Sequence, residues 1–518
     1  MVLKYMPQNI PAETALKTQP TGHQNSCDIF IIGGGINGCG IARELAGRGY
    51  NVQLAEMRDL SSGTSSWSTK LIHGGLRYLE YYEFSLVRKA LQERETLMGM
   101  APHLIHPLRF ILPHLPEMRP KWLLRAGLFL YDYLGPRKFL PASRSVNLKK
   151  DIAGAALAPH FTAGFEYSDC MVDDNRLTIL NARAAAALGA KIMPRNKVLS
   201  ARQYKDGWQI ETEQGAVHAK MVVNAGGPWA DTVRDLTNGA ERASHNQKSI
   251  RLVRGSHIIT KQLFSHDKAY IFQNSDGRIL FAIPYLDAFT LIGTTDVDHD
   301  EAPDNPQISD DEVAYICREV SAYLAKDITA DDVLHTYSGV RPLFDDGAQD
   351  AKAATRDYVL SFEAGTRDRW LNIFGGKLTT YRQLALQVAD KIATVEKAPS
   401  KARIGTATLP GGDIKNGDFA AFLKKLAHSH RDMAPSRLRR MAMAYGTEIY
   451  HIIGTHQGAI DEGQDFGLGL YQSEVDFLIT QEWAYDVDDI LMRRSKLGYQ
   501  ADDEMRARLG AYLAEKQG

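Results

Sequence analysis

The stretch CDIFIIGGGINGCGIARELAGRGYNVQLAE, residues 27–56, decides the fold of the N-terminal part of this chain. It opens with an apolar, β-branched run that is typical of a buried parallel strand. A glycine-rich turn, Gly33-x-Gly35-x-x-Gly38, follows and leads into a segment with helix-like apolar spacing. The run NVQLAE predicts a second strand that ends in Glu56. Strand, glycine turn, helix and second strand together predict a Rossmann-like unit.

The composition of this unit indicates a bound dinucleotide. One glycine permits the tight turn, the next lets the backbone approach a pyrophosphate, and the third allows close helix–strand packing. The helix N-terminus offers free N–H groups and a positive dipole end to the phosphates. Glu56 suits hydrogen bonds from a ribose diol and disfavours a 2′-phosphate, so FAD or NAD is favoured over NADP. A glycine-rich turn that binds no ligand is the alternative.

The segment after the second strand departs from the pattern of an NAD dehydrogenase. Residues 57–80, MRDLSSGTSSWSTKLIHGGLRYLE, carry no strand pattern where a further βα unit would normally follow. Because this polar, glycine-bearing segment lies between ordered-looking elements, we interpret it as a long functional loop. Its hydroxyls and backbone N–H groups suit the wall of a large cofactor site.

Length and composition narrow the class of protein. The 518 residues suffice for several domains. A net charge of −1 argues against a dedicated nucleic-acid binder. The 4 cysteines show no CxxC spacing, which favours a reducing compartment over a disulfide framework. Residues 1–26 lack the apolar core of a signal peptide, and we expect a loose tail there.

Further motifs follow in order: TSSWSTKLIHGGLRYLEYYEFSLVRKAL, GFEYSDCMVDDNRL, NAGGPW, RGSHII, IGTTDV, YSGVRPL, TRDY and FGGKLTTYR. With the glycine unit they span residues 27–382, and weaker matches continue through LPGG (409–412) and RRSKLG (493–498). In these motifs the chain resembles the FAD-dependent, aerobic glycerol-3-phosphate dehydrogenase family, within the flavin oxidoreductases related to D-amino-acid oxidase. It departs from the family in about 26 extra residues before the first strand, whose role stays open.

The resemblance implies a mixed α/β and α+β fold with a discontinuous Rossmann-like FAD-binding domain, an antiparallel-sheet substrate domain and a C-terminal helical domain. The alternating runs between about 250 and 295 suit an antiparallel sheet, and the charged, helix-like segments after 400 suit the third domain. The predicted ranges are 27–100, 165–240 and 335–400 for the FAD domain, 101–164 and 241–334 for the substrate-binding and membrane-facing domain, and 401–518 for the helical domain.

The resemblance also implies FAD as the cofactor and no metal. The segment LTT, which follows Gly375 and Gly376, would open a helix whose dipole could stabilise anionic reduced flavin. Plain N-capping is the alternative, and both roles can hold at once. The residues expected to contact FAD are Gly33, Gly35, Gly38, Glu56, Ser65, Ser66, Lys70, His73, Gly74, Gly75, Ala225, Gly226, Gly375, Gly376, Lys377, Leu378 and Thr379.

The implied substrate is sn-glycerol 3-phosphate. Its phosphate requires fixed cations, and the arginine fork can bond two phosphate oxygens at once. Solvation at the surface is the usual fate of an arginine or lysine and is the alternative reading. The candidate substrate-binding residues, taken from motif positions, are Arg77, Tyr78, Arg341, Arg356 and Lys377.

Oxidation of this substrate would move a hydride from C2 to flavin N5 and a proton from the C2 hydroxyl to a base. His257 is the best candidate base by residue type, with a structural histidine as the alternative. Arg341 is a poor base, but it could stabilise the developing alkoxide. Strand alternation puts His257 and Gly255 on one face, without indicating which face meets the flavin.

The family passes its electrons to a membrane quinone, and one segment suits a membrane surface. Residues 109–144 hold 7 Lys and Arg against 2 acidic residues around KWLLRAGLFLYDYL. A basic amphipathic helix with aromatic residues is typical of the headgroup plane, so we expect a peripheral enzyme on the cytoplasmic face of the inner membrane. A helix packed on the domain, or on the partner in a homodimer, is the alternative.

Two other functions stay open. A flavin oxidase would act on glycerol 3-phosphate with O₂, or on an amino or hydroxy acid. A flavin-bearing structural or regulatory protein with a decayed site is the non-enzymatic alternative, and the intact basic and glycine motifs argue against it.

Overall fold

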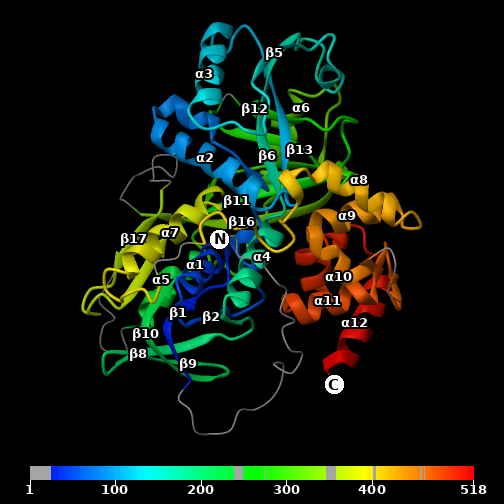
Figure 1. Ribbon diagram of the computed structural model, residues 1–518. Coiled ribbons are helices and arrows are strands. Elements are labelled where there is room, and N and C mark those ends of the chain that lie inside the picture. Colours follow the sequence, from blue (N-terminus) through cyan, green and yellow to red (C-terminus); the bar gives the residue numbers. More distant parts are fainter. Residues whose placement is uncertain are drawn as a thin grey trace.

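The computed structural model describes residues 25–237, 249–274, 276–345, 357–400, 404–455, 458–459 and 461–517. Two helix-covered β-sheets lie one above the other in Figure 1, and the C-terminal helices lie beside them. The first strand begins at Ser26, so nearly all of the predicted tail lies outside the described residues.

The first sheet contains the predicted dinucleotide unit. β1 (Ser26–Ile32) lies between and parallel to β2 (Val52–Ala55) and β10 (Gly215–Asn224), and α1 (Ile36–Gly47) follows β1. The order across the sheet is β17-β18-β10-β1-β2-β7, and the β8–β9 hairpin pairs with the first half of β10. The remaining strands are β7 (Lys191–Met193), β8 (Val198–Tyr204), β9 (Gly207–Thr212), β17 (Val359–Phe362) and β18 (Trp370–Phe374).

Three helices pack together against this sheet. α1 joins α4 (Asp174–Ala187) and α7 (Tyr381–Ile392), which come from distant parts of the chain. Leu45 of α1, Ile179 of α4 and Val388 of α7 are fully buried and share one apolar core with the side chains of β1. Burial of this apolar area fixes α1 over the sheet, and the start of α1 therefore meets the carboxyl ends of the strands.

The second sheet is largely antiparallel, as predicted for residues 250–295. Its order is β15-β11-β14-β13-β12-β4-β6-β3, with β16 paired to β11 and β5 paired to β6. Its strands are β3 (Leu71–Ile72), β4 (Ile105–His114), β5 (Arg144–Asn147), β6 (Ala163–Val172), β11 (Ile250–Lys261), β12 (Ala269–Gln273), β13 (Ile279–Tyr285), β14 (Phe289–Gly293), β15 (Val297–Asp298) and β16 (Val333–Phe344).

Helices cover both faces of the second sheet. α6 (Asp310–Ser321) packs with Ile258 and Phe272, whereas α2 (Phe84–Met100) and α3 (Lys121–Tyr133) belong to the core on the opposite face. The short α5 (Ala230–Asp235) follows β10 of the first sheet.

α3 is the basic helix predicted within residues 109–144, and it keeps much of its apolar side exposed. Trp122, Phe129 and Tyr133 are 72%, 57% and 63% exposed, whereas Leu128 and Tyr131 anchor the helix to the core. Among the described residues, no helix is both long enough and apolar enough to cross a membrane.

The C-terminal part forms a helical domain, as predicted, with an apolar core of its own. It lies beside the first sheet in Figure 1, in orange and red. Its elements are α8 (Phe419–Ser429), α9 (Pro435–Tyr445), α10 (Tyr450–Ile453), α11 (Gln472–Glu482) and α12 (Asp503–Gln517), with the short strands β19 (Gly454–Thr455), β20 (Gly458–Ala459), β21 (Asp465–Gly467) and β22 (Leu470–Tyr471).

The predicted fold class is confirmed, while the domain limits stay a prediction. The predicted ranges 165–240 and 335–400 assign most of β6 and most of β16 to the FAD domain. Both strands pair within the second sheet, which favours a later start for these two ranges. The chain passes from one sheet to the other several times. The amino-acid composition does not change at these crossings, so it does not indicate where one domain ends and the next begins.

Candidate active site

A cavity of about 830 Å³ lies between the carboxyl ends of the first sheet's parallel strands and one face of the second sheet. This is where open α/β sheets place their ligands. Most of the predicted site residues line it: Gly33, Gly35, Glu56, Ser65, His73, Gly74, Gly75, Arg77, Tyr78, Ala225, Gly226, Arg341, Gly375, Gly376, Lys377, Leu378 and Thr379.

The glycine-rich turn has the geometry that a pyrophosphate requires. Gly33 adopts a φ of +114°, and a Cβ there would come within 2.4 Å of the Ala225 carbonyl oxygen. A Cβ on Gly38 would lie 1.9 Å from the Gly33 carbonyl oxygen, so Gly38 serves helix–strand packing and does not line the cavity. Gly35 caps α1 without a side chain, and the helix start therefore faces the cavity through backbone groups.

Glu56 lies in the cavity wall directly after β2. Its carboxylate accepts hydrogen bonds from the N–H of Gly34 at 2.6 Å and of Arg58 at 2.9 Å. Burial raises the pKa of this carboxyl above its ordinary value, and the two backbone donors oppose the shift. Each carboxylate oxygen keeps a lone pair, so the group can still accept a hydrogen bond from a ribose hydroxyl.

The loop after β2 folds back onto the start of α1. The Ser65 hydroxyl oxygen accepts a hydrogen bond from the N–H of Ile36 at 2.9 Å, which caps the first turn of α1 from outside the helix. Within the described residues, the loop contributes Ser62, Gly63 and Thr64 to the wall, and then Trp67, Ser68 and Thr69.

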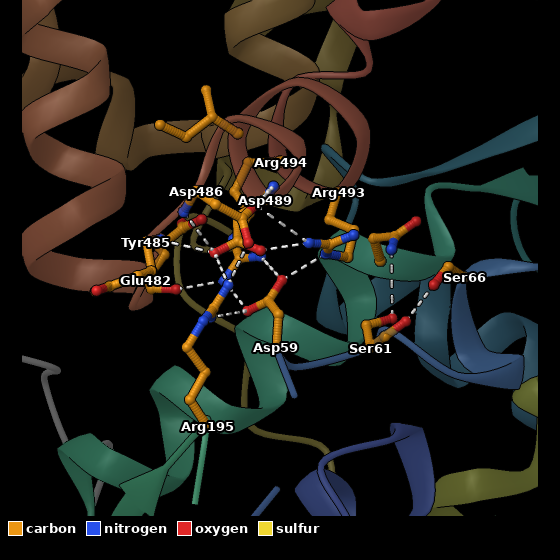
Figure 2. Close-up of polar contacts among 12 residues, drawn as sticks. Asp59, Ser61, Ser66, Arg195, Glu482, Tyr485, Asp486, Asp489, Arg493 and Arg494 are labelled. Carbon is orange, nitrogen blue, oxygen red and sulfur yellow. Dashed lines mark hydrogen bonds and ion pairs between the residues drawn. The ribbon is translucent and has the colours of Figure 1, made fainter. Parts of the chain in front are cut away.

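Two residues of this loop that were expected to contact the cofactor, Ser66 and Lys70, do not line the cavity. The Ser66 hydroxyl donates to the carbonyl of Ser61 (Figure 2). Lys70 adopts a φ of +60°, which turns its side chain away from the cavity. Its ammonium lies 3.0 Å from both carboxylate oxygens of Asp174 and also donates to the Ser66 carbonyl at 3.0 Å.

His73, Gly74 and Gly75 bring backbone to the cavity, as predicted. The N–H of Gly74 donates to the Tyr131 hydroxyl at 2.9 Å, and a Cβ on Gly74 would lie 2.6 Å from that oxygen. Gly75 has a φ of +72° and starts the short turn that carries Arg77 and Tyr78. Burial lowers the pKa of His73, which favours the neutral imidazole.

Two further segments, Ala225–Gly226 and Gly375–Gly376, complete this side of the wall. Ala225 and Gly226 follow β10, and the N–H of Gly226 donates to the Asn224 side-chain oxygen at 3.1 Å. Gly375 and Gly376 both have positive φ, 78° and 106°, between β18 and the turn that opens α7. The segment LTT, expected to open a helix, forms the short turn Leu378–Thr380, which lines the cavity directly before α7 begins at Tyr381.

Two of the predicted substrate-binding residues contact each other. The Lys377 ammonium lies 3.3 Å from the Tyr78 hydroxyl and 4.4 Å from the centre of the Tyr78 ring. Arg77 instead contacts Tyr81, to which it donates a hydrogen bond at 3.2 Å. Arg356 lies outside the described residues.

Arg341 reaches the cavity from β16 of the second sheet. It forms an ion pair with Asp296 and donates to the Thr294 hydroxyl at 2.9 Å. The guanidinium lies across Gly255, where a Cβ would come within 2.4 Å of a guanidinium nitrogen. The cation is therefore held in a fixed place beside the cavity with part of its surface free.

His257 does not line the cavity. Its ring lies over Gly293 and stacks on Tyr337, with ring centres 4.6 Å apart. Its Nε2 lies 3.0 Å from the hydroxyl oxygen of Thr69, which does line the cavity. Burial, followed by the nearby charges of Arg341 and Lys70, lowers the pKa of His257 well below its usual value.

Sequence reasoning missed Thr69, Thr294 and Asp296, which lie within the recognised motifs but carry no spacing signal. It also missed a set of glycines in the second sheet. Gly255, Gly293 and Gly339 leave room for Arg341, His257 and Trp67, respectively. The glycines in RGSHII, IGTTDV and YSGVRPL could have indicated a crowded sheet face, because a strand-interior glycine marks the close approach of another group.

Comparison with known proteins places the chain among flavin enzymes. The model of a family described as FAD dependent oxidoreductase matches residues 28–382. The model of the C-terminal domain of alpha-glycerophosphate oxidase matches residues 405–514.

Characterised relatives and solved structures extend over nearly the whole chain. Glycerol-3-phosphate dehydrogenase of Pseudomonas aeruginosa is 46% identical over 492 residues, covering 94% of each chain. D-erythritol 1-phosphate dehydrogenase of Brucella abortus is 45% identical over 477 residues, covering 91% of this chain and 94% of that protein. The structure of glycerol-3-phosphate dehydrogenase from Bacillus halodurans complexed with FAD superposes with a TM-score of 0.72 at 26% identity, covering 95% of this chain and 94% of that one.

Proposed function

The chain belongs to the family of FAD-dependent oxidoreductases, and on this premise we propose that it oxidises sn-glycerol 3-phosphate to dihydroxyacetone phosphate with FAD as hydride acceptor. The observation that carries the proposal is the 46% identity, over nearly full length, to a relative named glycerol-3-phosphate dehydrogenase. The resemblance stated from the motifs is thereby confirmed, as are FAD as cofactor and the assignment as an enzyme.

The cavity fits FAD. The start of α1 at Gly33 and Gly35 would hold the pyrophosphate, and Glu56 would accept hydrogen bonds from the ribose. The close packing around Gly33 leaves no room for a side chain, as expected where backbone meets a phosphate. The glycines at 74–75 and 375–376 would flank the ring system. FAD supplies the redox chemistry there by accepting a hydride equivalent.

The cations of the wall suit the two ends of the substrate. Lys377, supported by the Tyr78 hydroxyl, would bind the phosphate together with Arg77. Arg341, fixed by Asp296 and Thr294, would stabilise the charge that develops on the C2 oxygen when the hydroxyl loses its proton.

The proton would leave through Thr69. Thr69 faces the cavity, and its hydroxyl meets Nε2 of His257. In this step the C2 hydroxyl gives its proton to the Thr69 oxygen while the Thr69 proton moves to Nε2 of His257. The C2 hydrogen would leave as the hydride that bound FAD accepts, so the substrate would lose two electrons and two hydrogens in all. His257 thus keeps the predicted role of base, reached through Thr69.

A membrane quinone is the proposed electron acceptor. The exposed aromatic side chains Trp122, Phe129 and Tyr133, with nearby Arg and Lys residues, support binding to the cytoplasmic face of the inner membrane. A homodimer that buries α3 would remove this surface, and vesicle binding distinguishes the two.

Two alternatives rest on particular matches. The C-terminal match to a domain of alpha-glycerophosphate oxidase favours O₂ as acceptor, and rapid reoxidation of the reduced flavin by air would support it. The 45% identity to D-erythritol 1-phosphate dehydrogenase favours a longer polyol phosphate, which shares the hydroxyl and phosphate groups that the cavity addresses.

Anaerobic reduction of the bound flavin tests these proposals together. Glycerol 3-phosphate should bleach the flavin absorbance faster than erythritol phosphate at equal concentration. An amino acid or hydroxy acid that bleaches the flavin while both phosphates do not would reject the proposed substrate class.

A further inference from the structure

The C-terminal motif at residues 493–496, Arg-Arg-Ser-Lys, takes no part in the cavity. Among the described residues that line the cavity, none follows Thr380, so the described part of the C-terminal domain lies outside the cavity wall. Arg493 and Arg494 contact instead Asp59 on the back of the loop 57–70, here named the cofactor loop (Figure 2). Several residues of the cofactor loop face the cavity from its other side.

Asp59 is the first point of contact. Its carboxylate is 2% exposed and accepts hydrogen bonds from Arg493 at 2.6 Å and from Arg494 at 2.9 Å, with a second Arg494 nitrogen on the other oxygen. Arg494 is itself buried and also donates to the Glu482 carbonyl at 2.6 Å. This two-point pairing fixes both position and orientation of Asp59.

The charges around this contact balance one another. Arg195, beside Asp59 in Figure 2, lies 2.6 Å from Asp486 and 2.8 Å from Asp489. Arg493 pairs with Asp489 as well as with Asp59. Each buried charge here has a partner of opposite sign. Removal of one charged side chain therefore leaves its partner unpaired in the protein interior, which costs stability.

The contact continues from Asp59 to the glycine-rich turn. The carbonyl of Asp59 accepts a hydrogen bond from the N–H of Ser62 at 3.2 Å. The N–H of Ser61 donates to the carbonyl of Gly34 at 3.0 Å. Displacement of Asp59 would therefore displace Ser62 in the cavity wall and the turn beside the pyrophosphate.

Lys496 acts on the other end of the cofactor loop indirectly, through Asp174. Its ammonium is buried, hydrogen bonds to the Asn175 side chain and lies 4.0 Å from Asp174. Asp174 in turn accepts hydrogen bonds from the Ser68 hydroxyl at 2.7 Å and from Lys70 at 3.0 Å. Thr69, which meets His257, lies between those two anchored residues.

We propose that residues 493–496 act as a clamp from the C-terminal domain, which positions the cofactor loop against bound FAD and sets the place of Thr69. Arg493, Arg494 and Lys496 are positioning residues, because they act through Asp59 and Asp174. The identity of the bound cofactor and the use of Thr69 rest on the proposed function, whereas the clamp itself is tested without substrate.

The test measures release of FAD from the diluted holoenzyme by the rise in free-flavin fluorescence. Arg494→Met should release FAD about tenfold faster or more, because the loop loses its fixed position. Arg437→Met is the matched control, since Arg437 forms an ion pair with Glu462 inside the same domain. It should lower the unfolding temperature at saturating FAD while changing FAD release less than about twofold.

A charge-neutral pair of substitutions separates positioning from stability. Asp59→Asn with Arg494→Met removes both charges, so the unfolding temperature should recover while FAD release stays fast. If this double variant retains FAD as tightly as the wild type, or if Arg437→Met releases FAD equally fast, the clamp is rejected.

A milder variant covers the case in which Arg494→Met does not fold. Arg493→Gln, at the more exposed arginine, should speed FAD release in the same direction, and unchanged release would reject the clamp. If glycerol 3-phosphate does not reduce the flavin, the proposed substrate is rejected. The clamp is still tested in that case, because FAD release is measured without substrate.

Discussion

The hydroxyl oxygen of Thr69 lies 3.0 Å from Nε2 of His257, and only Thr69 of these two residues lines the cavity. A base behind the wall can receive a proton from the substrate only through a group in the wall. Substitution of Thr69 should therefore slow proton transfer without weakening substrate binding.

Thr69→Val keeps the shape of the side chain and removes the hydroxyl. We expect the rate of anaerobic flavin reduction to fall about 100-fold with a small change in KM, because the relay acts in the chemical step. Thr69→Ser should restore most of the rate, and stopped-flow absorbance measures both. A Thr69→Val enzyme that reduces its flavin at the wild-type rate would rule out the relay.

The pH profile follows from the lowered pKa of His257. The relay needs a neutral imidazole, and the neutral form is lost as the pH falls through the pKa. Because burial, Arg341 and Lys70 hold the pKa of His257 well below 6.5, flavin reduction should stay level from pH 6.5 upward and fall only at lower pH. The assignment of His257 as the base would be contradicted if the wild-type rate fell to half at pH 6.5 or above as the pH is lowered, and if His257→Ala abolished this fall.

Lys377→Met tests the phosphate end of the site. A hydrogen bond to a charged group contributes about 1.5–3 kcal/mol, so KM for glycerol 3-phosphate should rise about 10- to 100-fold. FAD content should stay near that of the wild type, as judged from the ratio of flavin to protein absorbance. Lys424→Met, on the exposed side of α8, serves as the control and should leave KM unchanged.

The exposed aromatic side chains of α3 test the membrane proposal. Trp122→Ser with Phe129→Ser should weaken binding to vesicles that contain anionic lipid about 100-fold or more, since each of the two buried side chains contributes about 1.5–3 kcal/mol. Sedimentation with vesicles measures the bound fraction. Leu334→Ser on β16 is the control, and equal binding by all three proteins would exclude α3 as the contact.

The part of the cavity wall that was expected to hold the cofactor could be predicted from the sequence, because it is built from local patterns. Gly33, Gly35 and Glu56 belong to one strand–turn–helix–strand unit, whose geometry follows from neighbouring residues. The motif residues Arg341 and Lys377 also reached the cavity, although the resemblance and not the spacing placed them there.

The expected site residues that do not line the cavity differ in side-chain direction, which depends on distant contacts. Lys70 and Ser66 lie on the correct loop, but the positive φ of Lys70 and the buried carboxylate of Asp174 turn Lys70 to the back. His257 lies on a strand whose two faces the alternation pattern could not distinguish. The clamp at residues 493–496 joins segments more than 400 residues apart, which no local pattern records.

Anaerobic titration of the holoenzyme with sn-glycerol 3-phosphate tests the central claim most directly. Absorbance near 450 nm, where oxidised flavin absorbs, reports the reaction. We expect full bleaching by glycerol 3-phosphate, with dihydroxyacetone phosphate formed in equal amount to the flavin reduced. Flavin that stays oxidised at saturating glycerol 3-phosphate would contradict the proposed function.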